Sequence, residues 1–272
     1  MELKFFSPHW GSEDLPFAKF ASKVKAAGFD GVEMSLPFDE TEKENILNEL
    51  KKNELLFIAQ HWETVDADIA IHKEAYEKRL RHLAAAKPLF INTQTGKDYF
   101  SFEENKSLIE LAANIQRETG ITIIHETHRG KFSFAAHITK SFLQQIPYLQ
   151  LTLDISHWCN VAESFLHDQK DAVELAIERT HHIHARVGYT EGPQVPDPKD
   201  DLWKDALEQH LSWWQQVVSH KLKTGMQSVT ITTEFGAPPY TVLLPQTHEP
   251  ISRQWENNIF MMQYLKQNLV LP

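Results

Sequence analysis

Short runs of apolar and β-branched residues alternate along the chain with longer segments whose apolar residues recur every three or four positions. The short runs predict strands over residues 3–7, 31–35, 55–60, 89–93, 121–126, 150–154, 181–186 and 229–234. The longer segments predict helices over residues 15–27, 41–53, 69–86, 102–119, 135–145, 161–180, 202–221 and 250–267. Gly28 and Gly120 directly follow two of these helices, at the position where glycine commonly ends a helix.

Regular alternation of strands and helices is typical of a parallel sheet with crossover helices. Eight such units without a linker-like stretch predict an α/β fold, a closed (β/α)8 TIM barrel in which residues 1–272 form a single domain. The alternative is an open doubly wound sheet. The first strand is followed by Ser-Pro-His-Trp-Gly rather than by the Gly-x-Gly-x-x-Gly of a dinucleotide-binding loop, so the barrel is favoured.

Composition and charge exclude some classes of binding partner. Among the 272 residues, 37 acidic and 27 basic side chains give a net charge of −10, which argues against a nucleic-acid surface. Cys159 is the single cysteine, so no internal disulfide forms, as is usual in the cytoplasm. The sequence has neither the pattern of a signal peptide nor a membrane-length apolar run. We therefore expect a soluble cytoplasmic protein that binds neither nucleic acid nor membrane.

Polar and ionisable residues collect at the predicted strand ends. In α/β barrels the active site lies at the carboxyl ends of the strands. The last four predicted strands each end in a residue that can bind a metal ion, and these four strand-end residues are Glu126, Asp154, His184 and Glu234. Any one of them alone is more commonly a loop residue or a helix N-cap. Because strand side chains alternate between two faces, all four can point into the barrel.

Convergence of these residues needs a counter-charge. Three carboxylates in contact would repel by about 4 kcal/mol per pair at an effective dielectric constant near 20. A divalent metal ion offsets this repulsion. Oxygen ligands with one imidazole favour Mn²⁺, and Mg²⁺, Co²⁺ and Zn²⁺ are compatible with the same set.

The order of these elements resembles that of a known superfamily. A glutamate at position 126, Asp-x-x-His at 154–157, His-x-His at 182–184 and Thr-Glu at 233–234 follow one another on consecutive strands. This series is similar to the xylose-isomerase-like barrels, which include ketose 3-epimerases, inosose dehydratases and endonuclease IV. The resemblance covers essentially the whole chain. It implies that the four strand-end residues are metal ligands and that the histidine at position 157 contacts the substrate beside the metal.

Two subgroups of that superfamily differ from this sequence. Arg186 is followed by Val-Gly-Tyr, whereas the ketose 3-epimerases carry Gly-Glu-x-x-Arg beyond the metal histidine. Endonuclease IV has further zinc-binding histidines and an Asp-x-His pair. Here Gln94 stands where a histidine of the fourth strand is expected, and Pro-Asp-Pro at 196–198 offers no such pair. Abasic-site cleavage is therefore disfavoured.

The superfamily's isomerases move a proton between carbons that flank a carbonyl, through an enediolate that a metal ion stabilises. We expect Glu126 and Glu234 to be the catalytic bases. The expected substrate contacts are His157, Arg186, His61, Trp10, Trp62 and Lys97. Strand position alone further suggests that Glu33 and Glu63 reach distal hydroxyls, and that Lys97 or Arg129 meets a distal phosphate or carboxylate.

These observations favour a divalent-metal-dependent isomerase or epimerase of a small sugar, sugar derivative or polyol. The alternatives are an inosose-type dehydratase with His157 as the acid, a metal-dependent phosphodiesterase, and a non-catalytic binding barrel. Residues 187–201 and 235–249 form long loops after the seventh and eighth strands. Such loops commonly have a function, here either to cover the pocket or to make a subunit contact in a homo-oligomer. The sequence leaves the substrate, its phosphorylation and its stereochemistry open.

Overall fold

Eight parallel strands close into a barrel in the computed structural model, which describes residues 1–271. The strands are β1 (Glu2–Pro8), β2 (Gly31–Met34), β3 (Leu56–His61), β4 (Ile91–Thr93), β5 (Ile123–Glu126), β6 (Leu151–Leu153), β7 (Thr180–His184) and β8 (Ser228–Thr232). They pair in chain order, and β8 pairs with β1 to complete the ring. The predicted single-domain (β/α)8 TIM barrel is confirmed. Pro272, the last residue of the predicted domain, lies outside the described residues.

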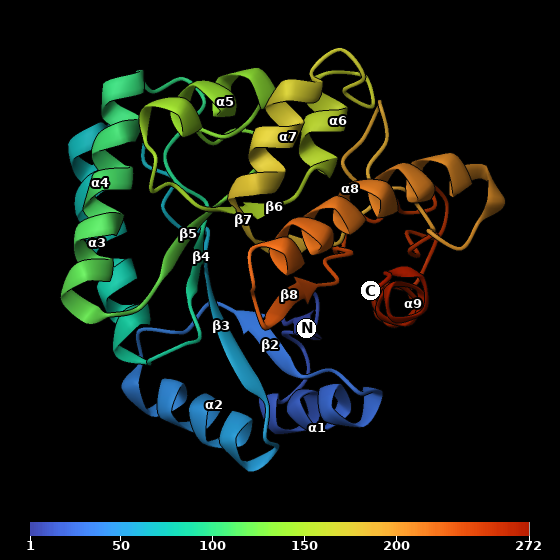
Figure 1. Cartoon of the computed structure of the whole chain (residues 1–272). Helices are drawn as coiled ribbons and strands as arrows, with labels where there is room; N and C mark the ends of the chain where they lie inside the picture. Colours follow the sequence, from blue (N-terminus) through green and yellow to red (C-terminus); the bar gives the residue numbers. More distant parts are fainter. Residues whose placement is uncertain (272) are drawn as a thin grey trace.

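Helices surround the strands (Figure 1). They are α1 (Phe17–Ala27), α2 (Glu40–Lys52), α3 (Ile69–Ala85), α4 (Phe102–Thr119), α5 (Ala136–Gln145), α6 (Ser156–Val161), α7 (Lys170–Arg179), α8 (Lys204–Lys223) and α9 (Gln254–Asn268), with a 3₁₀ turn, η1 (Asp201–Trp203), before α8. Within residues 1–271, none of these helices is long and apolar enough to cross a membrane.

Side-chain caps set the start of several helices. Asp39 accepts a hydrogen bond from the Glu42 N–H at the start of α2, and Asp68 caps α3 in the same way. Ser101 and Glu104 form a reciprocal capping box at the start of α4. These caps satisfy backbone N–H groups that have no partner within the helix, and they thereby fix the residue at which each helix begins.

The sequence prediction of one helix over residues 161–180 is wrong. Two helices occupy this region, α6 directly after β6 and α7 before β7. Between them, Glu163 and Leu166 adopt positive φ angles of 48° and 57°, which an α-helix does not contain. The early start of α6 places His157 next to the carboxyl end of β6.

The barrel interior changes from apolar to polar along the strands. Its apolar cluster is formed by Phe6, Ile58, Phe90 and Ile124. Side chains two positions apart on a strand share a face. Asn92 and Glu126 therefore continue the inward faces of Phe90 and Ile124, and both are buried. The fold thus closes one part of the barrel with hydrocarbon and collects polar groups towards the carboxyl ends.

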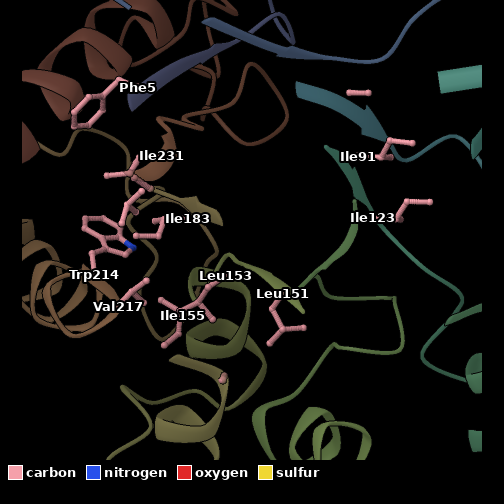
Figure 2. Close-up of a cluster of buried hydrophobic side chains, with 14 of the residues drawn as sticks. Phe5, Ile91, Ile123, Leu151, Leu153, Ile155, Ile183, Trp214, Val217 and Ile231 are labelled. Atoms are coloured by element: carbon pink, nitrogen blue, oxygen red, sulfur yellow. The ribbon is translucent and has the colours of Figure 1, made fainter. Parts of the chain in front are cut away.

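The main core lies between the strands and the surrounding helices. Figure 2 shows Ile183 and Ile231 on the strands beside Trp214 and Val217 of α8. All four side chains are fully buried. Burying such side chains contributes about 1.5–3 kcal/mol each. This packing fixes the outward faces of the strands and thereby determines which residues point inward.

Two long loops at the carboxyl ends of β7 and β8 are tied to each other. The Gly236 N–H donates to Gln194 Oε1 at 2.7 Å, and Gln194 Nε2 donates to the Gly236 carbonyl at 3.3 Å. Thr241 joins the same network through its hydroxyl, which donates to the Gly236 carbonyl at 2.6 Å. The loops therefore form one connected structure at this end of the barrel.

Candidate active site

The four strand-end residues meet in one buried cluster. Glu126 ends β5, Asp154 directly follows β6, His184 ends β7, and Glu234 lies two residues beyond β8. Each offers one ligand atom, and these atoms all lie within 4.8 Å of one another. We call this set the strand-end cluster. Its oxygen and nitrogen donors are consistent with a divalent metal site.

Strand pairing explains the convergence. Glu126 pairs with Thr152, two residues before Asp154, and His184 pairs with the residue two before Glu234. Because residues two apart share a face, the pairing directs neighbouring members of the cluster to the same side of the sheet. The inward direction predicted from the pleat agrees with this arrangement.

Asp154 is held so that one carboxylate oxygen faces the cluster. The Ser156 N–H donates to Asp154 Oδ1 at 3.2 Å, and the Ser156 hydroxyl donates to the same oxygen. The backbone is fixed as well, because the Asp154 N–H donates to Thr127 Oγ1 at 2.8 Å. Oδ2 is left to interact with Arg186, whose Nε donates to it at 3.1 Å.

Glu33 orients the imidazole of His184. His184 Nε2 lies 3.0 Å from Glu33 Oε1 and therefore donates to this carboxylate. His184 Nδ1 lies 2.7 Å from Glu234 Oε2 and 3.7 Å from Glu126 Oε1. Among the described residues this buried nitrogen has no partner in hydrogen-bond geometry. A nitrogen placed between carboxylate oxygens, with its ring held by a further carboxylate, is the usual arrangement of a metal-binding histidine.

The charge balance also suits a cation. Glu33 and the three carboxylates of the strand-end cluster are buried together, and they face the Arg186 guanidinium and His184. Burial lowers the pKa of His184, but the carboxylates of Glu234, Glu33 and Glu126 outweigh it and hold this pKa well above its ordinary value. Carboxylates that attract a proton to this ring also attract a divalent ion, which displaces the proton.

The two glutamates expected to act as bases lie in different electrostatic environments. Burial, with the nearby Glu234 and Asp154 carboxylates, raises the pKa of Glu126 to about 8. Burial acts in the same direction on Glu234, but the positive charges of His184 and Arg186 lower its pKa to about 2. Two carboxyl groups whose pKa values are separated in this way can serve as acid and base in one reaction.

Arg186 bridges two carboxylates of the strand-end cluster. Its Nη2 donates to Asp154 Oδ2 and, at 2.9 Å, to Glu234 Oε2. The guanidinium lies 4.6 Å from the ring centroid of Tyr240. His157 is next to it, with Nε2 at 3.4 Å from Arg186 Nη2. Burial, together with the positive charge of Arg186, lowers the pKa of His157 well below its ordinary value, so its ring is neutral near pH 7.

A cavity of about 530 Å³ opens at the strand-end cluster. Its lining residues are His9, Trp10, Glu13, Met34, Ser35, Gln60, Trp62, Gln94, His128, Arg186, Glu234 and Tyr240. Gln60 Nε2 donates to Glu234 Oε1 at 3.2 Å, and Gln94 Nε2 donates to Glu126 Oε1 at 3.2 Å. The amides therefore connect the pocket wall to both glutamates.

Trp10 is positioned by a glycine. Its ring lies so close to Gly236 that a Cβ atom there would stand 2.1 Å from the indole. Tyr240 packs edge-on against the same indole, with ring centroids 5.2 Å apart. Trp10, Tyr240 and Trp62 provide the aromatic part of the pocket wall.

The expected substrate contacts fall into two groups. Trp10, Trp62 and Arg186 line the pocket, whereas the described lining includes none of His61, His157 and Lys97. Gln60 lines the pocket in place of its neighbour His61, because successive side chains on a strand point to opposite faces. His61 is buried, and its two ring nitrogens lie 2.8 Å from the hydroxyls of Thr93 and Thr64.

Lys97 lies in the turn after β4 rather than at the pocket. The Lys97 N–H donates to Asn105 Oδ1 at 3.2 Å, and its carbonyl accepts from Asn105 Nδ2 at 2.9 Å. These bonds hold the turn against α4. Glu63, expected at a distal hydroxyl, instead pairs with Arg79 at 2.9 Å.

Sequence reasoning missed two important positions. Glu33 is not on the pocket wall, where strand position suggested it, but is buried against His182 and His184. The only sequence signal for this position is the alternation of side chains along β2, which directs Glu33 into the barrel. Tyr240 comes from an irregular loop, where no periodicity predicts the direction of a side chain.

Comparison with known proteins shows which solved structures share this fold. No protein-family model and no curated protein matches the sequence. Solved structures match along nearly the whole chain. The 3-keto-D-glucoside 4-epimerase YcjR from E. coli is 12% identical, with a TM-score of 0.65 over 98% of this chain and 100% of that chain. A xylose isomerase domain containing protein from Salmonella typhimurium LT2 is 14% identical, with a TM-score of 0.66 over 98% and 97%.

An enzyme of different activity shares the same fold. Endonuclease IV from Thermus thermophilus is 13% identical, with a TM-score of 0.60 over 98% of this chain and 100% of that chain. The chain therefore shares its (β/α)8 barrel fold with these enzymes. Since this fold carries both an epimerase and an endonuclease, the choice of reaction depends on the site.

Proposed function

We propose that the protein is a divalent-metal-dependent isomerase or epimerase of a small sugar, sugar derivative or polyol. The supporting observation is the strand-end cluster at the pocket, with one imidazole nitrogen and three carboxylates within 4.8 Å of one another. This donor set favours Mn²⁺, and Mg²⁺, Co²⁺ and Zn²⁺ are compatible with it.

The residues have complementary roles in this proposal. When bound, the metal ion supplies a Lewis acid that stabilises negative charge on substrate oxygens. One of the two glutamates, Glu126 or Glu234, accepts the proton from the carbon next to the carbonyl. In an isomerisation the same glutamate returns the proton to the neighbouring carbon, whereas in an epimerisation the other glutamate delivers a proton to the first carbon from the opposite face. Gln94 and Gln60 hold these two carboxylates through the bonds described above. Arg186 donates to a substrate oxygen from the pocket wall.

The pocket wall supports an unphosphorylated substrate. Within the described lining, Arg186 is the one permanently charged cation, and two carboxylates already hold it. Burial lowers the pKa of His128 to about 3, so that ring is neutral near pH 7. A phosphate group is normally bound by several charged donors. Trp10 and Trp62 instead offer apolar faces for the C–H groups of a sugar.

Proton exchange with solvent tests this function directly. The Mn²⁺-loaded protein is incubated in D₂O with a panel of ketoses, aldoses and inososes, and ¹H NMR follows deuterium incorporation. We expect exchange into at least one neutral sugar, and loss of exchange of at least ~100-fold in Glu126→Gln or Glu234→Gln, the usual size of a general-base contribution. Glu103→Gln is the matched control, because Glu103 is exposed on α4.

Each other outcome would contradict part of the proposal. Normal exchange in both glutamine variants would exclude these glutamates as the bases. Loss of water from an inosose would indicate a dehydratase instead. Cleavage of phosphodiesters without any exchange would replace the proposal with a nuclease function.

A further inference from the structure

Arg186 binds one carboxylate oxygen of Asp154 and one of Glu234, two members of the strand-end cluster. Ser156 donates to Asp154 Oδ1, and Gln60 donates to Glu234 Oε1. The remaining oxygens, Asp154 Oδ2 and Glu234 Oε2, both accept from Arg186 Nη2. A cation that binds these carboxylates from the inside of the cluster therefore meets oxygens that already have a cationic partner.

Glu234 Oε2 is shared most closely. It lies 2.9 Å from Arg186 Nη2 and 2.7 Å from His184 Nδ1. His184 Nδ1 is the nitrogen that the strand-end cluster offers to a metal ion. The guanidinium and a divalent ion would thus approach one buried oxygen, and two positive charges repel strongly where water does not screen them.

One end of the Arg186 guanidinium is free to make a new contact. The side chain is almost fully buried, and its Nη1 has no hydrogen-bond partner within residues 1–271. A buried N–H without a partner costs free energy. Arg186 lines the pocket and lies against the Tyr240 ring, which can support the flat guanidinium as it shifts.

We propose that Arg186 is an internal counter-ion that competes with the divalent metal ion for Asp154 and Glu234. Without the metal ion it neutralises the carboxylates and keeps the cluster assembled. When the ion binds, Arg186 leaves these oxygens and its guanidinium becomes a donor for a substrate oxygen in the pocket. The inference rests on the proposed metal-dependent function, and it predicts that Arg186 weakens metal binding.

Metal titration of the full chain tests this competition without an activity assay. Wild type, Arg186→Gln, Arg186→Lys and Arg129→Gln are stripped with EDTA, dialysed and titrated with Mn²⁺ by isothermal calorimetry. We expect Arg186→Gln to bind Mn²⁺ at least about tenfold more tightly than wild type, which corresponds to about 1.4 kcal/mol. Its melting temperature without metal should be lower, because buried carboxylates lose their counter-charge.

Arg129→Gln is the matched control. Arg129 lies over the same Tyr240 ring, at 5.1 Å from its centroid, but its Nη1 donates to Asn160 Oδ1 rather than to the strand-end cluster. It should bind Mn²⁺ with wild-type affinity. Circular dichroism without metal establishes that each variant is folded.

The outcomes separate this inference from the proposed function. Unchanged or weaker Mn²⁺ binding by folded Arg186→Gln would overturn the competition. If Arg186→Gln does not fold without metal, Arg186→Lys is the variant that tests the competition. Arg186→Lys keeps the positive charge that the carboxylates need, but it lacks the planar guanidinium that holds Asp154 and Glu234 together. It should bind more tightly than wild type, and equal or weaker binding would overturn the competition. Wild type that binds no divalent ion would contradict the proposed function, whereas binding by Arg186→Gln alone would still support the competition.

Discussion

At the scale of single residues, Glu33 shows how a buried carboxylate can shape a site that it does not line. It contacts His182 and His184 of β7 and accepts a hydrogen bond from Thr232. Burial raises its pKa, but the charges of His184 and His182 and their hydrogen bonds dominate and hold the pKa well below its ordinary value. Glu33 therefore stays ionised and keeps His184 Nδ1 directed at the other carboxylates.

Replacing Glu33 by glutamine should weaken Mn²⁺ binding by roughly 10–100-fold, the usual effect of losing such a supporting contact. The amide is uncharged and holds the imidazole less firmly. Isothermal calorimetry on metal-stripped protein measures the change, with Glu103→Gln as control. An affinity within about twofold of wild type would show that Glu33 does not position the ligand.

At the scale of elements, α8 and the loop after β7 are joined by a histidine. His210 Nδ1 donates to the Ala206 carbonyl at 2.8 Å, and its Nε2 accepts from the Gly188 N–H at 3.2 Å. Gly188 is required there, because a Cβ atom would lie 2.7 Å from Ser156. The loop that carries Arg186 towards the pocket is thus fixed by a neutral imidazole and a glycine.

This contact makes stability depend on pH. Burial lowers the pKa of His210 from 6.5 to about 4, so between these values the unfolded chain binds a proton that the folded chain does not. The stabilisation is present above pH 6.5 and is lost as pH falls towards 4, by about 3 kcal/mol. Urea unfolding at about pH 7, 5.5 and 4.5 should therefore show a smaller loss for His210→Gln than for wild type. Equal losses would contradict the assignment.

At the scale of the whole molecule, the barrel concentrates negative charge at one end. The chain carries a net charge of −10, and the strand-end cluster and Glu33 bury four carboxylates together. The apolar cluster of Phe6, Ile58, Phe90 and Ile124 lies on the same inward faces but further towards the amino ends of the strands. A cation bound at this end should therefore raise the free energy of unfolding of the whole barrel.

Removing the metal should lower the melting temperature of the whole protein. At a free Mn²⁺ concentration of about 100 times the Kd, binding stabilises the folded state by about 2.7 kcal/mol, or roughly 5–10 °C for a chain of this size. Differential scanning calorimetry with Mn²⁺ and with EDTA measures the shift. Asp154→Asn, which weakens the strand-end cluster, should show a smaller shift. The same shift in both proteins would place Mn²⁺ elsewhere.

Much of the architecture could be predicted because it depends on local patterns. Alternating strands and helices were sufficient to predict the barrel, and the pleat was sufficient to direct Glu126 inward. Predictions from local patterns were wrong where a single residue position determines the direction of a side chain or the end of a helix. His61 points away from the pocket because it lies one position after Gln60, and Glu163 and Leu166 interrupt a predicted helix through positive φ angles.

The sequence by itself determined the (β/α)8 barrel and the residue types at its strand ends, because periodicity and chain order are local properties. Only the tertiary structure decided that Glu33 supports His184, that Tyr240 covers Arg186, and that Arg186 holds Asp154 and Glu234. These contacts join residues far apart in the chain. They depend on barrel closure and loop packing, which set distances that no spacing along the sequence encodes.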